Sequence, residues 1–86
     1  MYPDATLQTI ISAALENDVD AYAFACDALA EWLDSGGCCP TVPDGTLSIP
    51  GTNTRWSLLS PFADVPFWRL VYWSHDGSVI KTYRLS

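Results

Sequence analysis

The first apolar pattern of the chain has the spacing of a helix. After Pro3, apolar residues recur at intervals of three and four, which places them along one side of a helix. We therefore predict a helix that is capped by Asp4 and broken around Asn17, which tolerates the left-handed conformation found at helix ends. The predicted core positions of this helix are Leu7, Ile10, Ile11, Ala14 and Leu15.

A second helix is predicted directly after the first. Asp18 can cap it, and Gly36-Gly37 stops it at about Ser35. Because the connection is so short, the two helices should form a helical hairpin. The apolar side of the second helix consists of Tyr22, Cys26, Leu29 and Leu33, with Ala25 and Trp32 at its edge.

The rest of the chain has the pattern of strands and turns. Glycine and proline are frequent in residues 36–54, which predicts a loop with one short strand near Thr46–Ile49. Three further strands are expected at Trp56–Leu59, Phe67–Trp73 and Val79–Leu85. The order α-α-β-β-β-β indicates the α+β class, with an N-terminal helical hairpin packed on a small C-terminal antiparallel sheet. At 86 residues, the chain should form a single domain, 1–86.

The register of the last hairpin depends on its turn. A two-residue Asp76-Gly77 turn directs one face to the core and places Arg69 opposite Arg84 on the other. A three-residue turn with Gly77 left-handed would shift the pairing by one residue and spoil this arrangement. The predicted core face is Trp68, Leu70, Tyr72, Lys81, Tyr83 and Leu85, and the opposite face is Arg69, Val71, Trp73, Ile80, Thr82 and Arg84.

Charge is divided unevenly along the chain. The formal net charge is −6, yet residues 1–54 contain eight acidic residues and no lysine or arginine. Residues 55–86 contain two acidic residues and all four basic ones. Such a division bears on solubility and on the choice of partner rather than on fold.

Four of the acidic residues share one side of the second helix. They lie within an arc of about 60° that extends roughly 21 Å along the helix axis. The stripe is either a solvated face or a row of charge presented to a basic partner. A second candidate binding surface is the aromatic and basic face of the hairpin. The candidate binding residues are Asp20, Asp27, Glu31, Asp34, Arg69, Trp73 and Arg84.

The remaining chemistry-bearing residues do not form a recognisable catalytic or metal site. Three cysteines are no disulfide framework, and adjacent Cys38-Cys39 lacks the spacing of zinc ligands. His75-Asp76 fits a hairpin turn better than a catalytic pair. We therefore expect no enzyme activity, no metal and no cofactor. Four cations in a chain of net charge −6 disfavour direct nucleic-acid binding.

The expected function is that of a non-enzymatic binding protein. No apolar stretch approaches the roughly 20 residues of a membrane span, so we expect no membrane contact. The lack of a recognisable targeting segment and the odd number of cysteines favour a cytoplasmic protein. In size, acidity and absence of catalytic motifs, the chain resembles the small acidic proteins by which phages and mobile elements block host defence, anti-CRISPR proteins among them. This resemblance implies an inhibitor that binds the basic surface of a nucleic-acid-handling complex. The alternative is a structural or adaptor protein that acts as a homodimer.

Overall fold

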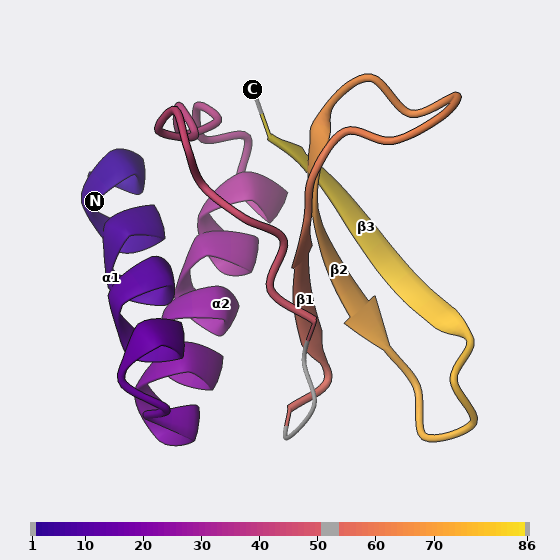
Figure 1. Cartoon of the computed structure of the whole chain (residues 1–86), viewed down its shortest axis with the longest axis horizontal. Helices are drawn as coiled ribbons and strands as arrows, with labels where there is room; N and C mark the ends of the chain where they lie inside the picture. Colours follow the sequence, from indigo (N-terminus) through magenta and orange to yellow (C-terminus); the bar gives the residue numbers. More distant parts are fainter. Residues whose placement is uncertain (1, 51–53, 86) are drawn as a thin grey trace.

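The fold consists of a helical layer and a small antiparallel sheet. The computed structural model describes residues 2–50 and 54–85. Helices α1 (Pro3–Leu15) and α2 (Val19–Asp34) precede strands β1 (Trp56–Leu59), β2 (Trp68–Trp73) and β3 (Val79–Leu85). The strands pair in the order β1-β2-β3, and Figure 1 shows both helices on the same side of the sheet. The predicted α+β class is confirmed, and the described residues form a sheet of three strands rather than the predicted four.

The start of α1 differs from the prediction. Asp4 does not cap the helix, because Pro3 already occupies the first helical position, where its fixed φ angle and missing N–H are well tolerated. Tyr2 is therefore the N-cap residue and makes no side-chain capping bond. Asp4 instead accepts a hydrogen bond of 2.7 Å from the backbone N–H of Thr41, which ties α1 to the loop after α2.

The junction between the helices follows the sequence closely. Asn17 has a φ of 56°, the left-handed conformation that ends α1. Asp18 then caps α2 by accepting a hydrogen bond of 3.2 Å from the N–H of Ala21. At the other end, Ser35 caps α2 and Gly36 turns the chain with a φ of 85°.

The core lies between the helices and the inner face of the sheet. Leu15, predicted to be buried, is 83% exposed, whereas Ala13 is buried. The reason is that the buried arc of α1 is centred nearer Ile10 than Leu7, so Leu15 at the end of the helix points away from it. The fully buried side chains that span the two layers are Leu7, Ile10, Cys26, Leu29, Leu58, Leu70 and Leu85.

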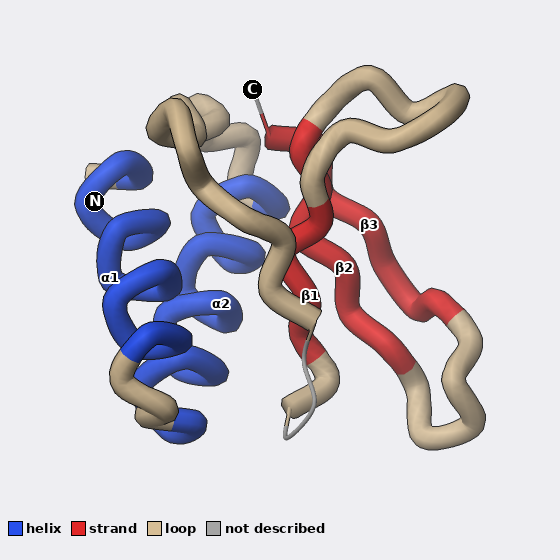
Figure 2. The backbone as a smooth tube through the Cα atoms, viewed as in Figure 1, coloured by secondary structure: helices blue, strands red, loops and turns tan. Residues whose placement is uncertain are grey.

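The segment Thr46–Ile49, predicted to be a strand, is part of the long loop between α2 and β1. Only Ile49 pairs with the sheet, through an isolated bridge to Leu58. Pro50 follows directly and has no N–H to extend a ladder. The loop runs past the sheet edge at β1 (Figure 2) and packs Val42 and Ile49 against the core.

The last hairpin combines the two turn alternatives. The Ser74 N–H donates to the Ser78 carbonyl, which leaves a three-residue turn, 75–77, with Gly77 left-handed at a φ of 87°. Trp73 therefore pairs with Val79 rather than with Ile80. Ile80 then forms a bulge that restores the register predicted for the two-residue turn. From Tyr72 to Trp68 the pairing is therefore as predicted, including Arg69 opposite Arg84.

Candidate functional site

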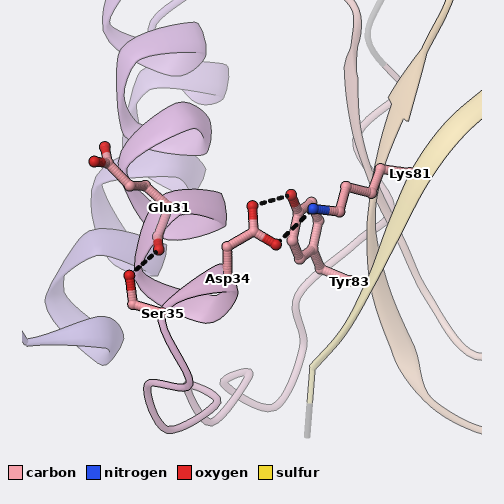
Figure 3. A network of polar contacts seen from close by, with 5 residues as sticks. All are labelled: Glu31, Asp34, Ser35, Lys81 and Tyr83. Carbon is pink, nitrogen blue, oxygen red and sulfur yellow. Dashed lines mark hydrogen bonds and ion pairs between the residues drawn. The ribbon is translucent and has the colours of Figure 1, made fainter.

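The four carboxylates of α2 are all exposed, and two of them contact the sheet. We call Asp20, Asp27, Glu31 and Asp34 the acidic face. Asp34 accepts hydrogen bonds from Lys81 Nζ at 2.6 Å and from the Tyr83 hydroxyl at 2.9 Å (Figure 3).

Asp27 makes the second contact between the acidic face and the sheet. Its Oδ1 accepts a hydrogen bond of 3.1 Å from the indole Nε1 of Trp56 in β1. Asp27 and Asp34 therefore join α2 to the sheet, besides contributing charge to the surface.

The carboxylates of Asp20 and Glu31 make no hydrogen bond or ion pair with any residue that the structure describes. The carboxylate of Glu31 points away from Asp34 and from β3 in Figure 3, and only the backbone carbonyl of Glu31 accepts a bond, from Ser35. Within residues 2–50 and 54–85, the carboxylates of Asp20 and Glu31 have no ion pair. These two residues are therefore the members of the acidic face that can meet a partner without breaking an internal contact.

A groove of about 380 Å³ lies between α2 and the sheet, with lining residues from β1, β2 and β3. Aromatic rings form part of its wall, with the Trp56 ring centroid 4.6 Å from that of Tyr72 and 6.2 Å from that of Tyr83. We call it the α2–β3 groove. The residues that line it are Asp27, Ala30, Glu31, Asp34, Trp56, Tyr72, Ile80, Lys81 and Tyr83.

The groove already holds one cation from the chain itself. The Lys81 ammonium is paired with Asp34 and lies 5.1 Å from the centroid of the Tyr83 ring. The hydrogen bond to Asp34 raises the pKa of Lys81, and the bonds from Lys81 and Tyr83 lower the pKa of Asp34. Because both side chains of the pair are about half exposed, at 52% and 48%, this contact adds little to stability and can exchange with solvent or with another cation.

The opposite face of the sheet, which we call the outer face, carries the two arginines of the hairpin strands, Arg69 and Arg84. Arg84 lies with its guanidinium carbon 4.6 Å from the centroid of the Phe67 ring. Trp73 donates a hydrogen bond of 3.0 Å from its indole to Ser57 in β1. Register places Arg69 on this same face. The structure thus brings the acidic candidates together on α2 and the hairpin candidates together on the outer face, and it separates the two groups by the thickness of the sheet.

The sequence did not lead us to predict the α2–β3 groove. The strands that contain Trp56, Tyr72, Lys81 and Tyr83 were predicted, but the contact of these residues with the acidic side of α2 was not. The available signal was the hairpin register, which places Tyr72, Lys81 and Tyr83 on the helix side. Using it required the position of α2 over the sheet, which only the fold supplies.

The cysteines show no arrangement for catalysis or metal binding in the part of the chain that the structure describes. All three are free, and no cluster of three potential metal ligands occurs there. Burial raises the pKa of the Cys26 thiol to about 12, so at neutral pH it remains protonated and unreactive. Exposed Cys39 donates to the backbone carbonyl of Arg84.

Comparisons with known proteins do not connect the chain to a family. No family model matches it, and no curated protein or solved structure shows significant similarity. Among the described residues, neither helix is long and apolar enough to cross a membrane.

Proposed function

We propose that this protein is a non-enzymatic binding module whose acidic face engages a basic surface of a protein partner. The observation that supports the proposal is the pair of unengaged carboxylates on α2, Asp20 and Glu31. They lie in a half of the chain that contains no lysine or arginine to neutralise them. Acidic patches of this kind accelerate association with basic partners through long-range attraction.

The partner that best suits an acidic face is a protein with a surface built to contact phosphates. Asp27, Glu31 and Asp34 lie about one helical turn apart, similar to the spacing of phosphates along a strand, and Asp20 lies about two turns before Asp27. The chain's resemblance to small acidic inhibitors, anti-CRISPR proteins among them, agrees with this choice. We therefore propose that the protein occupies the basic surface of a nucleic-acid-handling complex and blocks it.

Capture of partners from cells that produce the protein tests the proposal. The parent is compared with the charge reversal Asp20→Lys/Glu31→Lys, which leaves the contacts of Asp27 and Asp34 with the sheet intact. The control is Asp44→Lys/Asp64→Lys, which changes the net charge equally at two exposed loop positions. We expect a basic partner, identified by mass spectrometry, to be retained by the parent and the control and lost by the α2 variant. Equal retention by all three would contradict the proposal.

A second candidate function is that of a homodimeric adaptor, and the edge of the sheet favours it. β3 lies at one end of the strand order and exposes Val79 and Ile80, which are 51% and 56% accessible. An exposed strand edge with apolar residues is a template for pairing with another chain. A dimer of this kind would elute at twice the monomer mass and would be nearly insensitive to salt, unlike a complex formed through the acidic face.

A further inference from the structure

Two arginines lie directly opposite each other on the outer face of the sheet. Arg69 of β2 pairs with Arg84 of β3 in the antiparallel register. Side chains in directly opposed positions begin only about 5 Å apart, and like charges there are destabilising. The single ion pair within residues 2–50 and 54–85 joins Lys81 to Asp34 on the inner face. The repulsion between the two guanidinium groups therefore has no carboxylate to offset it in the described structure.

The two side chains are also held in place. The guanidinium of Arg84 stacks over Phe67, which restricts its plane. The Nε of Arg69 is buried and has no hydrogen-bond partner among the described residues. A buried donor without an acceptor costs free energy. This Nε is covered, so an anionic group would bind the terminal nitrogens of the two guanidinium groups.

The surroundings of the arginine pair are apolar and ordered. Val71 lies between Arg69 and Trp73 along β2. It is only 2% exposed, although it is not part of the core cluster on the inner face. The Trp73 indole is fixed by its bond to Ser57. Arginine and tryptophan are enriched at the energetically dominant positions of protein interfaces.

We propose that the outer face binds an acidic segment of a protein, with Arg69 and Arg84 sharing one aspartate or glutamate carboxylate. A carboxylate accepts two parallel N–H bonds, which suits guanidinium donors. A nucleic acid suits the face less well, because phosphate chains require several cations. The chain has two other basic side chains. Lys81 is paired with Asp34 on the inner face, and Arg55 contacts His75. The site is independent of the acidic face, since the helices cover the opposite side of the sheet (Figure 1).

The tryptophan indole N–H signals in nuclear magnetic resonance spectra distinguish the two faces. Trp73 reports on the outer face and Trp56 on the α2–β3 groove. The probe is the acetylated peptide amide Glu-Leu-Glu, and Gln-Leu-Gln is its uncharged counterpart. We expect the acidic peptide to shift the Trp73 signal and leave that of Trp56 in place, and we expect the uncharged peptide to shift neither.

Variants assign the effect to the arginine pair. Arg84→Gln removes one of two repelling charges at an exposed position, so the fold should be retained, and the affinity for the acidic peptide should fall about tenfold. The control is Lys81→Gln, which removes one cation from the inner face, and for which we expect the parental affinity. Equal responses to the two peptides, no response of Trp73, or equal losses in both variants would overturn the proposal. Tighter binding of a ten-nucleotide oligothymidine than of the acidic peptide at Trp73 would also overturn it, in favour of nucleic-acid binding.

Discussion

Leu29 shows what a single residue contributes to the fold. It lies on the core side of α2 and has no exposed surface. We expect Leu29→Ala to lower the free energy of unfolding by about 2–5 kcal/mol, through lost burial and the cavity left behind. The control Leu15→Ala removes the same atoms from a side chain that is 83% exposed, and it should change stability by less than about 0.5 kcal/mol. Denaturant unfolding measures both, and a loss below about 1 kcal/mol for Leu29→Ala would contradict the assigned core.

The hydrogen-bonded carboxyl of Asp76 should make the stability of the protein depend on pH. Hydrogen bonds from Ser74 and Ser78 lower the pKa of its carboxyl from 3.8 to about 2. A pKa that is lower in the folded state gives stability that is present above the unfolded pKa and lost as the pH falls through the folded one. The melting temperature should therefore fall between about pH 5 and pH 2, and it should fall less in Asp76→Ala.

Ser78→Ala provides an independent check on Asp76. It removes a hydroxyl that donates to the carboxylate and keeps the carboxylate itself. We expect its melting temperature to depend on pH less steeply than that of the parent. Identical pH dependence in the parent and both variants would show that these hydrogen bonds do not hold the carboxyl pKa down.

At the scale of elements, what could be predicted depended on whether the signal was local. The junction of the helices at Asn17 and Asp18 was predicted because capping involves neighbouring residues only. The absence of a strand at Thr46–Ile49 and the exposure of Leu15 were not predicted. Each depends on which other elements of the fold pack against that segment. Local pattern gives the periodicity of an element but not the direction in which the rest of the molecule covers it.

The hairpin shows how two local preferences can be reconciled. The loop prefers three residues with Gly77 left-handed, whereas the alternation of the strands requires the register of a two-residue turn. The extra residue, Ile80, is accommodated as a bulge, so that Leu70 and Tyr83 still face the core. Sequence reasoning treated the two turns as exclusive because it did not include a bulge.

Gly77 tests this account of the hairpin. Its φ of 87° is accessible to glycine at little cost and strained for alanine. Gly77→Ala should therefore lower the free energy of unfolding by about 1 kcal/mol, and Gly77→Asn should lower it less, because asparagine tolerates the left-handed region. Thermal unfolding of the three proteins gives the comparison. Equal stability of the alanine and asparagine variants would argue against a left-handed residue at this position.

At the scale of the whole molecule, charge is separated by the sheet. The acidic face lies on the helix side, and Arg69 and Arg84 lie on the outer face. The positions of the acidic residues on one side of α2 could be predicted from helical spacing. The contacts of Asp27 with Trp56 and of Asp34 with Lys81 could not be predicted in this way. The partners in these contacts are far apart in the chain, separated by 29 and by 47 positions.

The affinity of the captured partner for charge-reversed protein tests the central claim most directly. The binding kinetics of the parent, Asp20→Lys/Glu31→Lys and Asp44→Lys/Asp64→Lys are measured by surface plasmon resonance at low and at physiological salt. If the acidic face engages a basic surface, the α2 variant should associate at least about tenfold more slowly than the parent at low salt, and the difference should shrink as salt screens the charges. The loop variant should remain close to the parent. Association of the α2 variant at the parental rate at low salt would contradict the claim and would leave the acidic face with a solubilising role only.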